Sequence, residues 1–189
     1  MTLLALDTSS TLTGWAARSD CGTVSYGRLD MREGIPIRGR HPGLILLRAH
    51  AQIGTLIDQH RPRAVIFEQP IVRGSGTRIL WSIAGIVELA AAERGLPTGE
   101  LGVSKWRAAL LGAGNAPKEA STAWALANGY APEDDNVADA LCILHAWLLL
   151  EERAEAARRV DEKRAAARAA TRAARRLPRG CRMAAQSAA

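Results

Sequence analysis

An apolar run at the start of the chain, Leu3–Leu6, ends on a single carboxylate, Asp7, and this placement constrains the fold strongly. A hydroxyl-rich turn follows, then Gly14 and a second apolar run, Trp15–Ala17. Burying an acid at the end of a strand is costly unless a cation or hydrogen-bond donors meet it. Asp7 is therefore either a metal ligand or the cap of its own turn, and for an isolated Asp-Thr-Ser the cap is the commoner case.

A second buried strand ends in the same way. Ala64–Phe67 is a short, continuous apolar run of the kind found in parallel strands buried on both faces, and it stops at Glu68. The loop after it, residues 72–78, carries Arg73 and Arg78 among glycines, and its amides and guanidinium groups are suited to phosphate. Its spacing matches no phosphate-loop or dinucleotide fingerprint, so an ordinary solvated loop stays open as the alternative.

Alternation, turn residues and helical periodicity predict the remaining elements. An antiparallel meander is expected at the start of the chain, followed by a basic loop at 30–43, which contains Arg38 and Arg40. Ser104 is expected to cap a short helix, and Lys118 to lie in the first turn of the next one. The expected strands are Leu3–Thr8, Gly14–Arg18, Thr23–Leu29, Ala64–Phe67 and Pro97–Leu101, and the expected helices are Leu44–His60, Ile79–Arg94, Lys105–Leu111, Pro117–Ala127 and one from Asn136 into the tail.

A third carboxylate lies at the start of the last helix. Asp134 or Asp135 is a good N-cap, and an acidic first turn is ordinary decoration of a helix dipole. That explanation fits Asp139 less well, because Asp139 lies among apolar residues on the way into the helix. Asp135 and Asn136 share its face at spacings of four and three residues.

These acids suggest one metal centre. If the strands that end at Asp7 and Glu68 are neighbours, both acids emerge at one edge of the sheet, and a helix packed there brings Asp139 to them. Oxygen ligands of this type suit Mg²⁺ or Mn²⁺. Two such ions about 4 Å apart would clamp the attacking and leaving oxygens of a phosphodiester. A zinc site is not expected, because the four histidines are scattered.

Charge divides the chain into two parts. Residues 1–150 hold 14 basic and 14 acidic residues, whereas residues 151–189 hold 11 basic and 5 acidic ones, so the net charge of +6 lies in the tail. We expect a folded domain at 1–150 and a basic Ala/Arg-rich tail at 151–189, either helical or disordered. Such a tail favours non-specific attraction to nucleic acid, or is simply solvated.

Composition favours a cytoplasmic protein. No apolar run of about 18 residues is present, and the chain enters a strand at once without the pattern of a secretion signal. Three widely spaced cysteines do not suit a disulfide scaffold, which agrees with a reducing compartment.

Four motifs together resemble the RuvC family of Holliday junction resolvases, in a phage-type or divergent bacterial form. They occur in the family's order over roughly residues 2–148 and are Asp7-Thr8-Ser9 with Thr13-Gly14-Trp15, Ile66-Phe67-Glu68-Gln69-Pro70, Leu111–Lys118, and Asn136–Leu141. The resemblance implies an α/β ribonuclease H-like fold, a five-stranded mixed sheet flanked by helices. It also implies a metal-dependent endonuclease that cuts branched DNA, usually as a homodimer.

The resemblance also assigns residues. Asp7, Glu68 and Asp139 match the family's metal-binding acids, and Lys118 matches a lysine that contacts the scissile phosphate region. The loop from Ile71 to Arg78 matches the segment inserted into the junction, so the expected DNA contacts are Arg73, Arg78, Lys105, Lys118, Arg38 and Arg40. The family's fourth acid is replaced by Asn136, and either its carbonyl oxygen or the neighbouring Asp135 is left to serve as that ligand.

Two other functions are weighed. A non-catalytic protein that binds branched DNA on the same fold is compatible with Asn136 and the basic tail, but it gains nothing from three acids that face phosphate. An actin-like or sugar-kinase ATPase has a similar first turn, but such proteins repeat the domain, and no second turn of this kind occurs here.

Overall fold

The computed structural model describes residues 2–35, 42–71 and 77–176, with side chains through Arg172. It consists of two units, residues 1–149 and residues 150–189. The first unit holds the sheet and its helices, and the second continues the last helix. Each unit is described by itself below.

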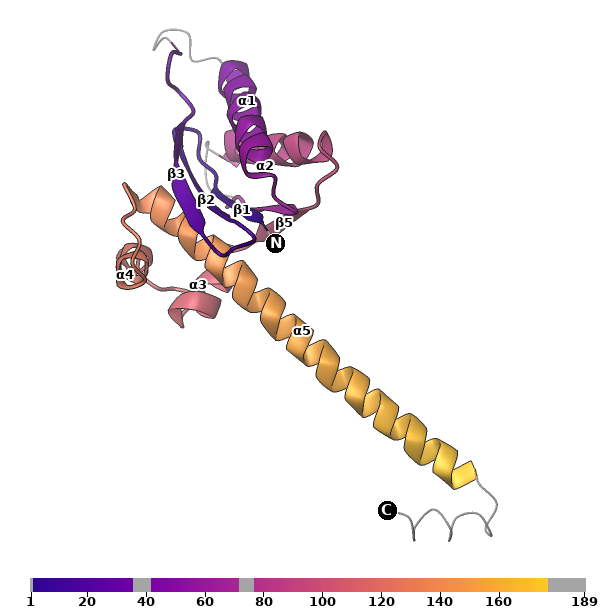
Figure 1. Ribbon diagram of the computed structural model, residues 1–189. Coiled ribbons are helices and arrows are strands. Elements are labelled where there is room, and N and C mark those ends of the chain that lie inside the picture. Colours follow the sequence, from indigo (N-terminus) through magenta and orange to yellow (C-terminus); the bar gives the residue numbers. More distant parts are fainter. Residues whose placement is uncertain (1, 36–41, 72–76, 177–189) are drawn as a thin grey trace. The chain divides into compact units, whose positions relative to one another are not determined.

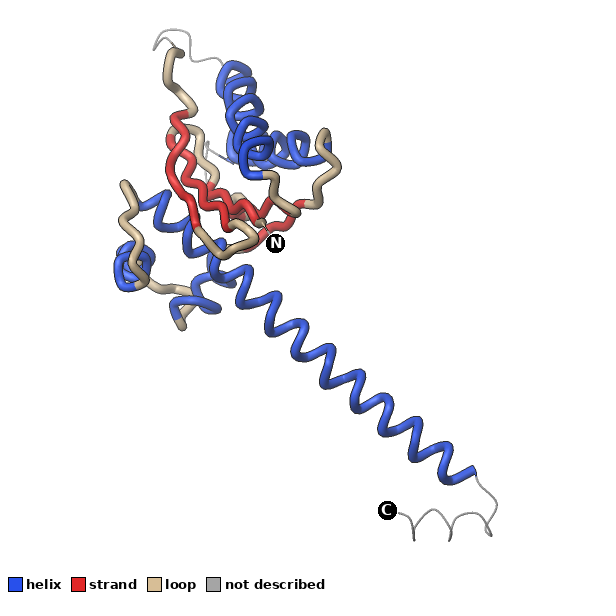
Figure 2. The backbone as a smooth tube through the Cα atoms, viewed as in Figure 1, coloured by secondary structure: helices blue, strands red, loops and turns tan. Residues whose placement is uncertain are grey.

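A five-stranded mixed sheet forms the centre of the first unit (Figure 2). The strands are β1 (Leu3–Asp7), β2 (Leu12–Arg18), β3 (Val24–Asp30), β4 (Ala64–Glu68) and β5 (Thr98–Leu101). Their spatial order is β3-β2-β1-β4-β5, with β1, β2 and β3 antiparallel and β1, β4 and β5 parallel. The expected antiparallel meander and the expected mixed sheet are both confirmed.

Five helices accompany the sheet in the described residues: α1 (Pro42–His60), α2 (Thr77–Ala92), α3 (Val103–Leu111), α4 (Glu119–Ala127) and α5 (Asp135–Arg176). The prediction that Ser104 caps α3 is wrong, because the helix begins at Val103, two residues before the expected Lys105, and Gly102 occupies the N-cap. Lys118 occupies the N-cap of α4 rather than its first turn, where Glu119 offers the charge that the helix dipole prefers.

Opposite faces of β1 and β4 pack against different helices. Leu4, Leu6 and Phe67 join the apolar core formed with α1 and α2, which lie on one face of the sheet (Figure 1). Successive side chains of a strand point to opposite faces, so Asp7 and Glu68 point to the other face. The first turns of α5 lie on that face.

Gly14 allows α5 to approach the sheet at the level of Asp7. Gly14 is the register partner of Asp7 on β2. A Cβ atom at Gly14 would lie 2.0 Å from the carbonyl oxygen of Asn136 and 2.7 Å from the backbone nitrogen of Val137. Only glycine permits this approach, which sets the first turn of α5 beside the end of β1.

The second unit contains the later part of α5. The helix runs to Arg176, so the tail is helical to that point, and its described side chains from Glu152 to Arg172 are exposed. Alanine and i,i+4 pairs such as Glu155 with Arg159 support a helix that lacks a buried face. None of the described helices is both long enough and apolar enough to span a membrane.

Trp81 departs from the sequence interpretation. For Trp81 the sequence favours a core position over stacking on a base, but its side chain is 42% exposed on α2. The helix is apolar on several sides around this position, so periodicity alone does not identify its buried face.

Candidate active site

Asp7 and Glu68 end neighbouring parallel strands on one face of the sheet. Leu6 of β1 pairs with Phe67 of β4, and the two acids follow these residues directly. Their carboxylates therefore emerge side by side at the same edge. This is the juxtaposition that the sequence pattern requires.

The Asp7 carboxylate does not cap its own turn. Two hydrogen bonds between Ser9 and Thr13 hold the turn instead. The backbone N–H of Ser9 donates to Thr13 Oγ1 at 3.1 Å, and the Thr13 hydroxyl group donates to the carbonyl oxygen of Ser9 at 3.2 Å. Among the described residues, no hydrogen bond reaches the Asp7 carboxylate. The cap interpretation therefore has no support in the described residues, and the ligand interpretation stays a prediction.

Like charges surround Asp7. Burial raises the pKa of its carboxyl group well above the usual value, and neighbouring carboxylates raise it further. Those carboxylates belong to Glu68, Asp139 and Asp135, while the positive charge of Lys118 opposes them. Residues from β1, β4 and α5 thus lie within electrostatic reach of one another.

Glu68 is held by a neighbour from α3. The indole N–H of Trp106, which is fully buried, donates a hydrogen bond to Glu68 Oε2 at 2.9 Å. Burial is the main reason that the pKa of Glu68 rises to about 7, whereas the Trp106 bond lowers it. A carboxylate with this pKa loses its proton readily when a cation arrives.

Asp139 is buried in the second turn of α5 and is incompletely paired. One guanidinium nitrogen of Arg107 lies 3.9 Å from Asp139 Oδ2, while Oδ1 has no hydrogen-bond partner among the described residues. Burial raises the pKa of this carboxyl group, and Ser121 and Arg107 lower it. A buried oxygen without a partner is costly, so this site suits a ligand that supplies positive charge.

The residues that start α5 differ in their surroundings. Asp134 is the N-cap, and its Oδ1 accepts a hydrogen bond from the backbone N–H of Val137 at 2.9 Å. Asp135 forms an ion pair with Lys118, which lowers the pKa of Asp135 and raises that of the lysine. The backbone of Asn136 lies against Gly14, so that a Cβ atom at Gly14 would overlap it. Lys118 therefore lies beside the acids through Asp135.

The acids of this edge fit a divalent cation in chemistry. Three carboxylates of raised pKa, one of which has an orphaned oxygen, form the hard donor set that Mg²⁺ and Mn²⁺ prefer. In the described part of the chain, no three Asp, Glu, His or Cys side chains are already gathered as closely as metal ligands. Mutual repulsion of carboxylates without a cation is the physical reason to expect such spacing.

The expected DNA contacts are placed only in part. Arg78 on α2 and Lys105 on α3 are exposed, as is Lys118. The remaining expected contacts, Arg38, Arg40 and Arg73, lie outside the described residues. Exposed cations therefore lie on α2, on α3 and just before α4.

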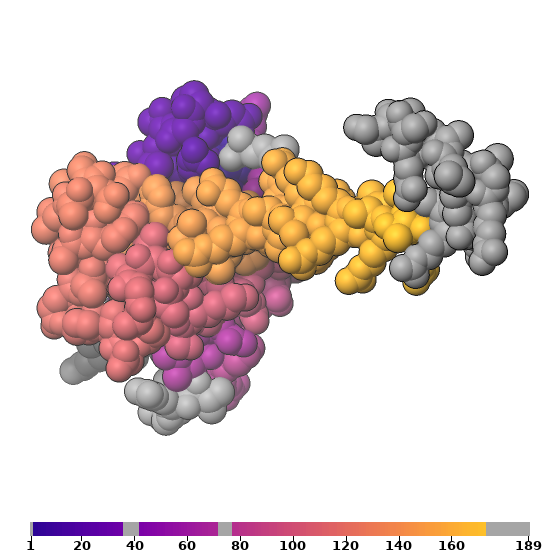
Figure 3. All heavy atoms as spheres, turned by 90° about the horizontal axis from the view of Figure 1, so that it is seen from below, coloured from indigo at the N-terminus to yellow at the C-terminus, as the bar shows by residue number. Residues whose placement is uncertain are grey.

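Sequence reasoning missed two residues of the site, Trp106 and Arg107. They are neighbours on α3, which packs beside α4 (Figure 3). Arg107 also donates a hydrogen bond to the carbonyl oxygen of Ala116 at 3.0 Å, which ties α3 to the segment before Lys118. No local sequence pattern marks these two residues as members of the site.

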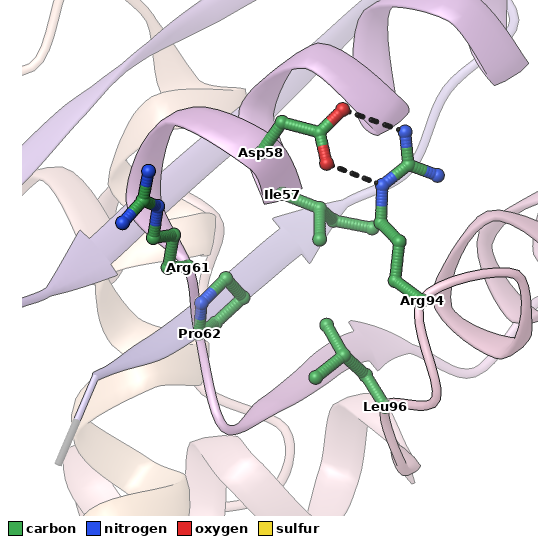
Figure 4. A pocket seen from close by; sticks show the side chains of 6 residues that line it. All are labelled: Ile57, Asp58, Arg61, Pro62, Arg94 and Leu96. Carbon is green, nitrogen blue, oxygen red and sulfur yellow. Dashed lines mark hydrogen bonds and ion pairs between the residues drawn. The ribbon is translucent and has the colours of Figure 1, made fainter.

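A cavity of about 370 Å³ lies near the amino ends of β4 and β5, away from the carboxyl ends that carry the acids (Figure 4). Pro62 and Leu96, just before β4 and β5, line it together with Ile57. Its acid, Asp58, is fully paired with Arg94 through two hydrogen bonds of 2.7 and 2.8 Å. This hollow therefore lacks the unsatisfied carboxylates of the other edge.

Curated relatives share much of the chain. The chain is 38% identical over 139 residues to "Crossover junction endodeoxyribonuclease RuvC" of Rhodococcus jostii, covering 66% of this chain and 72% of that protein. Proteins of the same name from Ruegeria pomeroyi and Saccharopolyspora erythraea are each 34% identical, over 54% and 67% of this chain. The matched part spans between 49% and 72% of the lengths of such relatives. No family model matches the chain.

Solved structures agree on the fold. The Thermus thermophilus RuvC structure has a TM-score of 0.65 at 23% identity and matches 82% of this chain and 97% of its own. The yeast mitochondrial Holliday junction resolvase Ydc2 has a TM-score of 0.60 at 12% identity, over 85% of this chain and 83% of its own. The fold is therefore ribonuclease H-like, as expected, and with relatives of up to 38% identity the chain belongs to the RuvC family.

Proposed function

We propose that the protein is a metal-dependent, structure-selective DNA endonuclease that resolves Holliday junctions or other branched DNA. The observation that carries this proposal is that Asp7, Glu68 and Asp139 come from three separate elements and lie within electrostatic reach of one another. Membership of the RuvC family supports the same substrate class. The site of action would be the cytoplasm, where chromosomal DNA is accessible.

Asp7, Glu68 and Asp139 would hold Mg²⁺, with Mn²⁺ as a substitute and two ions per site. A divalent cation there supplies Lewis-acid activation of water and neutralises charge at the phosphodiester. The oxygen of Asn136 or the carboxylate of Asp135 would complete the ligand set. Asp135 is engaged by Lys118, so its use as a ligand requires that pair to loosen.

Basic residues would position the DNA. Lys118 would hold the phosphate next to the acids. Arg107 would partly neutralise the charge of Asp139, whose Oδ2 atom it approaches. Hydrolysis forms a bond from a water oxygen to phosphorus and breaks the bond to the 3′-oxygen, which leaves as a hydroxyl group. Arg78 and Lys105 would bind the flanking backbone, together with Arg38, Arg40 and Arg73.

A homodimer would place two such sites on opposing strands of one junction. Family membership supports this assembly. Sedimentation of the full chain, alone and with a four-way junction, measures it directly. A dimer is expected in both samples, and a monomer on the junction would contradict the assembly.

The test is cleavage of a labelled four-way junction, a flap and a plain duplex in Mg²⁺, Mn²⁺ or EDTA. Paired nicks in the junction are expected with either metal, and Asp7→Asn should abolish them without loss of junction binding. Asp58→Asn, at the other end of the sheet, is the matched control and should cut normally. Equal cutting of the plain duplex would contradict structure selectivity.

The alternative is a protein on this fold that binds branched DNA without cutting it, and the replacement of an acid by Asn136 favours it. Tight junction binding without cleavage in either metal would support this function. Asn136→Asp would then be expected to restore cleavage. Failure of that variant to cut would leave binding as the activity.

A further inference from the structure

The later part of α5 has a steep gradient of charge. Residues 151–162 hold five acidic and three basic residues, whereas residues 163–189 hold eight basic residues and no acid. The described side chains from Glu152 to Arg172 are all exposed. Of these basic residues, Lys163, Arg164, Arg168 and Arg172 have described side chains, and all four are exposed on the helix.

Three arginines form a stripe along one side of this helix. Arg164, Arg168 and Arg172, here called the arginine stripe, recur every four residues, which places them about 6 Å apart along the axis and about 40° apart around it. Arg164 lies 3.9 Å from Asp161. Among the described residues, Arg168 and Arg172 belong to no ion pair, so their charges are available.

The helix lacks the features of other binding surfaces. Val160 is the one large exposed apolar side chain described in α5 beyond residue 150, and alanine fills most positions between the arginines. A coiled-coil seam requires repeated large apolar residues, and an amphipathic membrane helix requires an apolar face of Trp, Phe or Leu. Neither pattern is present, so charge decides the partner.

We propose that the arginine stripe is a separate contact surface for the phosphate backbone of duplex DNA. This inference rests on the proposed function, since the duplex would be an arm of the same branched substrate. Guanidinium groups bind phosphate through paired hydrogen bonds, and the small alanines let the helix approach a groove closely. The contact reads no sequence and depends strongly on salt.

The test uses the full chain in EDTA, where no cutting occurs, with a fluorescent unbranched duplex as the probe. The variant replaces Arg164, Arg168 and Arg172 by alanine, which keeps helix propensity. A matched control replaces Arg153, Arg158 and Arg159, which removes the same charge from the acidic part of the helix. A third variant carries lysine at the three stripe positions.

Affinity is measured by anisotropy over a range of KCl concentrations. Each lost phosphate contact flattens the slope of log affinity against log salt by about 0.9, so the stripe variant should be flatter by about 3. The control and the lysine variant should keep the slope of the wild type. Equal flattening in the stripe variant and the control would overturn the proposal, because net charge alone would then explain binding.

Two further outcomes separate the proposals. If the stripe variant binds duplex like the wild type but loses binding to phosphatidylserine vesicles, the partner is an anionic membrane and the stripe proposal fails. If the wild type cuts no junction yet shows the stripe effect in EDTA, the nuclease proposal fails and the stripe proposal stands.

Discussion

Strand β4 has an acid near each of its ends, and the two have opposite surroundings. Asp58, in the last turn of α1 before the strand, accepts two hydrogen bonds from Arg94, which lower the pKa of its carboxyl group. Glu68, at the carboxyl end, is more buried, and its pKa rises to about 7. Arg94 compensates the charge of Asp58, whereas the Trp106 hydrogen bond and the charge of Arg107 do not offset the effect of burial on Glu68.

The difference shows where this fold accepts an unfavourable electrostatic arrangement. A paired surface acid adds little to stability and performs no chemistry. Buried acids that repel one another lower stability, but they create affinity for a cation. The predictions below test whether the two ends of the sheet behave as differently as their surroundings indicate.

The largest effect is expected from Gly14→Ala. Its Cβ would overlap the backbone of Asn136, so α5 must move away from β2 at the acidic edge. We expect a loss of about 3 kcal/mol in the free energy of unfolding, with loss of cleavage, measured by urea denaturation and junction assay. Gly85→Ala on α2, where a Cβ meets no atom within 4 Å, is the control and should be neutral or stabilising. Wild-type stability in Gly14→Ala would refute the close docking of α5.

The next effect is a pH dependence in EDTA. Folded Glu68 keeps its proton up to pH about 7, whereas the unfolded chain releases it near 4.5, so stability is full below this window and falls as pH rises through it. The shift corresponds to at most about 3 kcal/mol. In Glu68→Gln the free energy of unfolding should fall less between pH 4.5 and pH 7 than in the wild type, as measured by urea denaturation at several pH values.

Asp58 is expected to change the stability with pH in the direction opposite to Glu68. Its lowered pKa gives stability that is present at neutral pH and is lost as pH falls into the acidic range. Asp58→Asn should therefore leave the decline toward pH 7 unchanged. A flat profile in the wild type would mean that the acids at the carboxyl end are not strained.

A smaller effect is expected from Trp106→Phe, which removes the hydrogen bond to Glu68. We expect a loss of about 1–2 kcal/mol and a pKa of Glu68 above its present value, seen as an upward shift of the pH window. Trp147→Phe is the matched control, because the buried indole N–H of Trp147 has no hydrogen-bond partner in the part of the chain that the structure describes. Equal pH profiles in both variants would show that Trp106 only fills space.

The smallest effect is expected from Asp58→Asn at neutral pH. Its ion pair with Arg94 is largely exposed and screened by solvent, so the melting temperature should change little and cleavage should not change. Differential scanning calorimetry and the junction assay measure these two outcomes. A loss of cleavage would mean that the two ends of the sheet are coupled.

Much of the fold is readable from the sequence, because each strand has a local signal. The apolar runs before Asp7 and Glu68 predict buried strands. The turn residues between the first three strands predict the antiparallel meander. Helix faces were harder to assign, as Trp81 shows, because its helix is apolar on several sides. The wrong cap at Ser104 has a similar cause, since Gly102 offers no side chain to recognise.

The acids of the site are readable because each interrupts an apolar pattern. Trp106 and Arg107 are not, because their roles arise only when α3 packs beside the end of β4. No local pattern shows which acid a buried indole will meet. The roles of Asp135 and Asn136 likewise depend on the contact of Gly14 with α5.

The most direct test of the account is the melting temperature in Mg²⁺ and in EDTA at a pH above 7, for the wild type, Asp139→Asn and Asp58→Asn. A cation that binds only the folded state raises stability by RT ln(1 + [Mg²⁺]/Kd). Mg²⁺ should raise the melting temperature of the wild type and of Asp58→Asn, and should leave Asp139→Asn nearly unchanged. An equal rise in all three proteins, or in none, would contradict a cation site at the carboxyl ends of β1 and β4.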